Sequence, residues 1–461
     1  MGILLTRATV LTGKQNDKVL TNGAIAIDND KIIDVGDSNI LESKYQNFDK
    51  HVLTNRLIIP GLINNHTHTV LNVLRGAIEN AGSADRVYGY MVPISFVMTD
   101  EDRKALAAVG CLEAIKSGTT TLVDPLRFVN SYAETMANTG LRLYLAESAA
   151  DAVTTEIRTS GYRYDKSWGD AFLERTLQLI DNHHATKNNR VQCMVAAHAT
   201  DICSPWLLRE LNDIAHSKGL RRTIHLAQST QEVTQVKTMA EGKTPVEYLL
   251  ENDWLGRDVL AAHCSYCTTS DIGLLSETAT SMAHCPASSA RRGYHGLANM
   301  PGLVDLGVNV TLGTDNMSED MFEAMRVGLI LNRGMREDTG VPTPKDIFNW
   351  ATINPAYSLE REDLGNIDKN MKADISIVRL DRAHLSPIID TLSSLVHYGQ
   401  ASDVESVIVD GEWVMKEGKV LTMDEEEVIT QAQNATIRAW SALKKQWGDI
   451  IIPEEFDQFL S

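Results

Sequence analysis

Eight short apolar segments, separated by stretches with helical periodicity, constrain the fold of this chain more than any other feature. They lie at residues 57–59, 119–123, 142–146, 191–197, 222–226, 259–262, 280–283 and 309–312. Helical patterns fill the intervals, for example at 101–117 and 205–217. Strands that alternate with helices over about 310 residues predict an α/β fold of the (β/α)8 TIM-like barrel type. A doubly wound sheet is the rival, but no glycine-rich phosphate-binding sequence follows the first segment.

Both ends of the chain carry shorter strand patterns that are bounded by turn signals. They lie at 3–11, 24–27 and 31–36 near the start, and at 373–378, 405–409 and 412–415 near the end. We therefore expect residues 1–56 and 369–423 to form one small β-sandwich built from both termini. Residues 57–368 are expected to form the barrel, and residues 424–461 a C-terminal helix and tail.

Charge and composition exclude several classes of partner. The chain has 43 basic and 61 acidic residues, a net charge of −18, so nucleic acid and membrane surfaces are not expected as partners. No apolar run has membrane-spanning length, and the first residues are too polar for a signal peptide. The six cysteines follow no disulfide pattern, which is typical of reduced thiols in a cytoplasmic protein.

Histidine or aspartate follows most of the expected barrel strands, where such barrels carry their functional residues. The residues are His66, His68, His198, His225, His263, His284 and Asp315. His66 and His68 are two residues apart, so on a strand both rings point to the same side and reach one ion. With His225 as a third nitrogen ligand and Asp315 as a carboxylate, the set suits a divalent metal such as zinc.

Several motifs in this chain resemble the amidohydrolase superfamily, in the branch of the triazine hydrolases and the guanine, cytosine and adenosine-type deaminases. They are PGLINNHTH at 60–68, LRG at 74–76, SGTTT at 117–121, HLA at 225–227, AHC at 262–264, AHCP at 283–286 and GTD at 313–315. The resemblance covers nearly the whole chain, including its β-rich ends. It implies a mononuclear metal-dependent hydrolase in which activated water attacks a C–N bond of a small nitrogen-rich molecule. The bond belongs to a ring amine, amide, urea or carbamate.

The resemblance also implies roles for individual residues. The metal ligands are His66, His68, His225 and Asp315, and they hold one divalent ion per subunit, zinc or alternatively iron. Asp315, His263 and Gln228 act in catalysis. His198, Gln228, His263, His284 and Asn316 contact the substrate. Members of this branch are usually homo-oligomers, and we expect a dimer or larger assembly with a contact surface around residues 439–447.

Gln228 departs from the pattern, since ring-deaminating relatives carry glutamate at this place. Glutamine can hydrogen-bond but cannot shuttle a proton. Either another acid such as Glu232 replaces it, or the protein does not carry out ordinary ring deamination. Two alternative functions stay open: a hydrolytic dehalogenase acting on a heteroaromatic ring, and a non-catalytic relative that kept the barrel.

Overall fold

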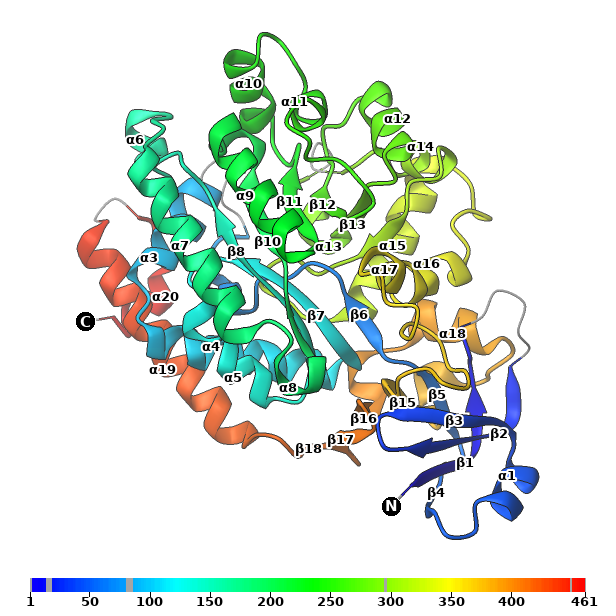
Figure 1. The fold of residues 1–461 in the computed structure, drawn as a ribbon. Coiled ribbons are helices and arrows are strands. Elements are labelled where there is room, and N and C mark those ends of the chain that lie inside the picture. The colour runs from blue at the N-terminus through cyan, green and yellow to red at the C-terminus, as the bar shows by residue number, and fades with distance from the viewer. Residues whose placement is uncertain (1, 14–18, 80–85, 294–296, 448–449, 461) are drawn as a thin grey trace.

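The structure is a computed structural model, and it describes residues 2–13, 19–79, 86–293, 297–447 and 450–460. Its central element is a parallel sheet whose hydrogen-bonded path runs through eight strands, as the sequence predicted (Figure 1). Their bounds are β6 (Leu62–Asn64), β7 (Thr119–Leu126), β8 (Arg142–Ala149), β10 (Val195–Ala199), β11 (Arg222–Leu226), β12 (Val259–His263), β13 (Ser281–His284) and β14 (Val310–Leu312). A short strand, β9 (Val191–Cys193), pairs with β8 beside this path.

Backbone hydrogen bonds between the first and last of these strands close the barrel. The Asn65 amide donates to the Leu312 carbonyl at 2.9 Å, and the Thr314 amide donates to the His66 carbonyl at 3.1 Å. The chain therefore holds the segment after β6 directly against the segment after β14. This contact brings the imidazole rings of His66 and His68 to the side of the barrel where Asp315 lies.

The prediction that residues 57–59 form the first barrel strand was wrong. Residues 57–59 belong to β5 (Arg56–Pro60), which lies between β1 (Ile3–Val10) and β15 (Ile375–Arg379) in the sheet built from the chain ends. A short apolar run suits a buried strand in either sheet, so the pattern alone could not distinguish them. The chain passes to the barrel at Gly61, where a Cβ atom would lie only 2.2 Å from the Thr120 side chain.

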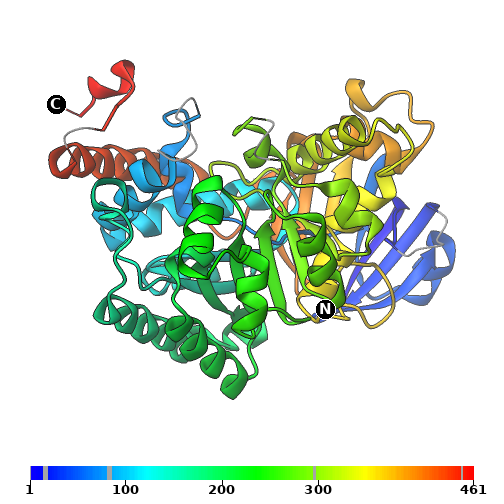
Figure 2. The same ribbon diagram turned by 90° about the horizontal axis from the view of Figure 1, so that it is seen from above.

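Strands from both termini join in one mixed sheet of nine strands, which confirms the expected β module. The remaining members are β2 (Leu20–Asp28), β3 (Lys31–Asp37), β4 (Asp49–Val52), β16 (Val404–Val409), β17 (Glu412–Lys416) and β18 (Lys419–Val420). Side chains from β1, β2, β3, β5, β15 and β16 share a single apolar cluster, so the sheet curls around its own core. Figure 2 shows this sheet beside the barrel, on the side away from the C-terminus.

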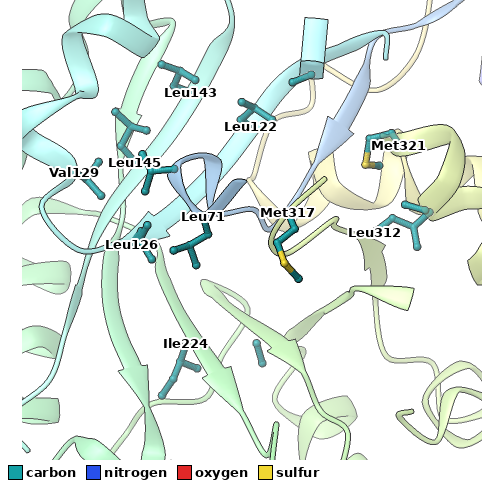
Figure 3. Packing of buried hydrophobic residues seen from close by; sticks show 14 of the residues in the cluster. Leu71, Leu122, Leu126, Val129, Leu143, Leu145, Ile224, Leu312, Met317 and Met321 are labelled. Carbon is teal, nitrogen blue, oxygen red and sulfur yellow. The ribbon is translucent and has the colours of Figure 1, made fainter. Parts of the chain in front are cut away.

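Helices cover the outside of the barrel and supply most of its core. The main ones are α4 (Asp100–Lys116), α7 (Lys166–His183), α9 (Pro205–Lys218), α12 (Thr269–Glu277) and α15 (Met321–Arg336). Strand residues such as Leu122, Leu143 and Ile224 are fully or almost fully buried in the cluster drawn in Figure 3. A smaller cluster that includes Ile63, Val123 and Leu260 joins residues from several strands of the barrel. The barrel is thus a packed scaffold, and its loops are free to carry function.

The C-terminal helix α19 (Glu425–Gln446) packs against this chain's own helix α4. Ala439 and Trp440 are buried, and the Trp440 indole donates to the Val73 carbonyl at 2.8 Å. The face that we expected to contact another subunit is therefore covered within the chain, and assembly stays a prediction. Among the described residues, no helix is long and apolar enough to span a membrane.

A buried ion-pair network fastens the barrel to the sheet of the chain ends. Arg142, at the start of β8, is 1% exposed; its guanidinium lies 2.8 Å from Asp374 and 2.9 Å from Asp410. Arg142→Met should lower the free energy of unfolding by about 3–5 kcal/mol, because it takes the ion-pair partner from the buried Asp374 carboxylate, while Asp410 keeps Lys372 at 2.8 Å. Denaturant unfolding measures the change. The matched surface variant Arg379→Met should cost less than about 1 kcal/mol, and an equal loss in both variants would contradict the role of the network.

Candidate metal centre

Five functional side chains meet at one rim of the barrel because each stands at the carboxyl end of a strand. His66 and His68 follow β6, His225 lies in β11, His263 ends β12, and Asp315 follows β14. Parallel strands place their carboxyl ends on the same side, so residues far apart in sequence come together here. All five are at most 5% exposed.

The potential ligand atoms of these residues converge on one point. His68 Nε2 lies 3.1 Å from His225 Nε2 and 3.6 Å from Asp315 Oδ1, and His66 Nε2 lies 4.0 Å from Asp315 Oδ1. Two overlapping sets have all their ligand atoms within 4.8 Å of one another: His66, His68 and His225, and His66, His263 and Asp315. The second set brings His263 as close to this point as the residues predicted to be ligands.

The chemistry of this cluster fits a divalent cation. Both ring nitrogens of His66 are buried and have no hydrogen-bonding partner among the described residues. Burial lowers the pKa of His66 well below its ordinary value and lowers the pKa of His68 to about 3, so both rings are neutral. Neutral imidazoles with one carboxylate are the donors that zinc prefers, and they leave a position for water.

Neighbouring groups orient two of the candidate ligands. The Nδ1 atom of His225 lies 2.5 Å from the His198 carbonyl, so Nδ1 carries the hydrogen and Nε2 faces the cluster with its lone pair. The Ser288 hydroxyl donates to Asp315 Oδ2 at 2.5 Å. Burial alone raises the pKa of Asp315, but His263, His68 and the Ser288 hydroxyl hold it at about 2, so the carboxylate is ionised.

The backbone is strained at two of these positions. His263 has φ of 76° and Asp315 has φ of 68°, a region that costs roughly 1–2 kcal/mol for a residue with a side chain. Such conformations persist where the surrounding structure requires a particular side-chain direction. Here they turn both side chains towards His66, whose ring centroid lies 5.3 Å from that of His263.

A cavity opens beside the cluster and has the size of a small-molecule site. It measures about 1070 Å³ including its open mouth. His68, His225 and Asp315 line it, as do His198, Gln228 and Asn316, three of the residues expected to contact substrate. His263 and His284 are buried and are not among the lining residues.

Glu232, the acid that we considered as a replacement for Gln228, does not line this cavity. Its carboxylate accepts hydrogen bonds from the amides of Ala227 and Gln228 at 2.9 and 2.7 Å, and from the Thr200 hydroxyl at 2.5 Å. Burial and the nearby charge of Asp201 raise the pKa of Glu232 to about 8. Glu232 therefore holds the loop that presents Gln228 and is not in a position to meet a substrate.

The sequence reasoning missed further residues of the cavity wall, including Arg127, Asp201 and Arg86. Arg127 directly follows β7, and Asp201 stands two residues after β10. Both follow the carboxyl ends of barrel strands, which is the position that identified the histidines as candidate functional residues. Extending that rule to arginines and to residues a few positions beyond each strand identifies them from sequence.

Comparisons with known proteins agree with this geometry. The model of the amidohydrolase family matches residues 57–414. A 5'-deoxyadenosine deaminase of Methanosarcina barkeri is 30% identical over 438 residues, which cover 94% of this chain and 97% of the relative. A 5-methylthioadenosine/S-adenosylhomocysteine deaminase of Thermococcus sibiricus is 33% identical over 419 residues, or 90% and 94% of the two chains.

Solved structures share the same fold. An adenosine deaminase from Xanthomonas campestris with bound zinc has a TM-score of 0.84 at 22% identity, over 95% of this chain and 98% of the other. A triazine hydrolase variant has a TM-score of 0.85 at 21% identity, over 94% and 99%. The expected resemblance, and with it a hydrolase that acts on carbon–nitrogen bonds, is confirmed. This chain belongs to the amidohydrolase family.

Proposed function

We propose that this protein is a zinc-dependent hydrolase that cleaves a C–N bond at an electrophilic carbon of a nitrogen-rich molecule about the size of a nucleoside. The observation that carries the proposal is the convergence of His66, His68, His225 and Asp315 beside the open cavity. Four ligands suggest one ion per chain, and a structural neighbour with bound zinc supports zinc over iron. The ion, when bound, acts as a Lewis acid and lowers the pKa of water from about 15.7 towards about 7.

The residues of the chain would then divide the proton transfers between them. Asp315 is ionised, with Oδ1 facing the histidines and Oδ2 accepting from Ser288, so its carboxylate lies where it can accept a proton from water. His263 lies against the same cluster without lining the cavity, so it would hold a proton beside Asp315 and the attacking water rather than meet the leaving group directly. Gln228, on the cavity wall, can orient the substrate through its amide.

The names of the sequence relatives suggest which bonds to test first, because several are deaminases of adenosine derivatives. The experiment is an ammonia-release screen of zinc-loaded protein against 5'-deoxyadenosine, methylthioadenosine, adenosine, simple amides, ureas and amino-triazines. We expect ammonia or amine release from at least one compound. Release from none of them would contradict the proposed function.

Gln228→Glu tests how protons move in the site. Glutamate can carry a proton to a ring nitrogen, so the variant should raise by about 10²–10⁴ the turnover of those ring amines that the wild type hydrolyses poorly. Turnover of the compound that the wild type hydrolyses fastest should not rise, because that reaction already proceeds without a carboxylate at this place. Gln231→Glu adds the same charge on the same cavity wall and serves as the control. A large gain on the best wild-type substrate would overturn our interpretation of Gln228.

Hydrolytic dehalogenation of a heteroaromatic ring is the second candidate, and Gln228 is the observation that favours it. Chloride departs as an anion and needs no proton from the protein, so a site without a proton-shuttling glutamate suffices. Chloride release from chloro-triazines, measured in the same screen, distinguishes this reaction from C–N hydrolysis.

A further inference from the structure

The cavity beside the histidine cluster is positively charged, although the chain as a whole is acidic. Among the described residues, four arginines line it, namely Arg86, Arg127, Arg291 and Arg292, against two carboxylates, Asp201 and Asp315. The full chain has 43 basic and 61 acidic residues. Basic residues thus outnumber acidic ones in the cavity, whereas acidic residues outnumber basic ones in the chain. A ligand with negative charge would account for this difference.

Arg127 is the most unusual of these arginines, because it is buried and forms no ion pair within the described residues. It is 3% exposed, and its Nε and Nη2 atoms have no hydrogen-bonding partner among the described residues. Burial lowers the pKa of the Arg127 guanidinium to about 10, so it stays cationic at neutral pH. A buried charge without a partner is costly, and native structures rarely keep one unless a ligand supplies the opposite charge.

Two carboxylates near Arg127, Asp201 on the same cavity wall and Glu147 opposite Leu126 on the neighbouring strand, are already engaged elsewhere. Asp201 accepts hydrogen bonds from the hydroxyls of Tyr88 at 3.1 Å and Tyr162 at 2.6 Å. Glu147 lies 2.8 Å from the Arg175 guanidinium and also accepts the Val129 amide at 3.1 Å. Neither acid forms an ion pair with Arg127 in the part of the chain that the structure describes.

Arg292 follows the short helix α13 (Pro286–Ala290) and also lacks a carboxylate partner among the described residues. Its Nη1 donates to the Gln228 carbonyl and its Nη2 to the Ser289 hydroxyl, both at 3.1 Å, while Nε has no partner. Arg127, Arg292 and the candidate metal ligand His225 all line this one cavity. Two cationic groups therefore flank the place where a substrate would meet the metal ligands.

We propose that the substrate carries an oxyanion, a carboxylate or a phosphate, that Arg127 and Arg292 bind in this cavity. Arginine matches such groups because its planar fork donates two parallel hydrogen bonds to two oxygens. The inference rests on the proposed function for the identity of the reaction, but the binding step does not require turnover. It adds to that function the chemical class of the substrate.

The test compares three probes with one scaffold: adenosine, adenosine 5'-carboxylate and adenosine 5'-monophosphate. Isothermal calorimetry on zinc-loaded wild-type protein should show that at least one anionic probe binds about 10- to 100-fold more tightly than adenosine, as expected for charge-assisted hydrogen bonds. The better of the two anions identifies carboxylate or phosphate as the favoured group. Equal affinity for all three probes, or binding of none, overturns the proposal.

Variants assign the preference to the arginines. Arg127→Met should remove most of the anion preference, measured as the ratio of anion affinity to adenosine affinity. Arg127→Lys should restore part of this ratio, and Arg379→Met, on the surface of the terminal sheet, should not change it. If Arg127→Met fails to fold, Arg292→Gln provides the same comparison at the second cation. Ammonia release is measured on the same samples. Anion preference without hydrolysis would support the oxyanion site and contradict the proposed function. Hydrolysis without anion preference would support the proposed function and contradict the oxyanion site.

Discussion

His66→Ala should purify with far less zinc than the wild type and should show no hydrolysis above background. His66 belongs to both sets of converging ligand atoms, and both of its ring nitrogens are buried without another partner. Loss of a residue that merely orients a ligand costs about 10–100-fold in metal affinity, and loss of a ligand should cost more. Inductively coupled plasma mass spectrometry gives the metal content, and ammonia release gives the activity.

The matched control is His51→Ala, which removes an imidazole from the sheet of the chain ends. His51 pairs with Asp49 at 3.0 Å and is remote in the fold from the barrel rim. This variant should retain the zinc content and turnover of the wild type. A normal zinc content in His66→Ala would show that the cluster does not bind the ion as we propose.

His263→Asn should retain the metal and lose turnover by about 10²–10⁴, the usual contribution of a general acid or base. We assign the ligand role to His66, His68, His225 and Asp315 and leave His263 for proton transfer. Asparagine fills a similar space without a titratable proton, so the fold should persist. Metal analysis and steady-state kinetics on one preparation separate the two roles.

The variant distinguishes a ligand from a proton carrier, because the potential ligand atoms of His263, His66 and Asp315 also lie within 4.8 Å of one another. If His263→Asn contains no metal, His263 is itself a ligand and the division of roles is incorrect. If it contains metal and keeps full turnover, His263 takes no part in catalysis. His384→Asn, at a half-buried ion pair with Asp403, controls for the loss of an imidazole as such.

The barrel and the histidine cluster could be predicted from sequence because both follow strong local patterns. Strand-length apolar segments mark the sheet, and the residues at their carboxyl ends meet at one rim in any parallel barrel. His66, His225 and Asp315 lie more than 80 positions apart in sequence, yet the strand rule alone brings them together. Helix boundaries also agreed where capping residues mark them, as Ser204 does for α9.

Other features depend on contacts that leave no local signal. Residues 57–59 suit either sheet, and only their pairing with β1 and β15 decides between them. The hydrophobic face around Trp440 resembles a subunit contact in sequence but packs on the chain itself. Glu232 was a plausible acid by its spacing, but its hydrogen bonds with backbone amides direct it away from the cavity. Only the three-dimensional structure shows that Arg127 has no counter-ion in the part of the chain it describes.

A zinc titration of wild-type protein, after its metal has been removed by chelation, tests most directly whether hydrolysis depends on one ion per chain. Hydrolysis of the best compound in the screen is measured at each zinc-to-protein ratio. We expect negligible activity without metal and a linear rise that ends at about one ion per chain, as four converging ligands imply. Full activity in the metal-free protein would contradict this dependence.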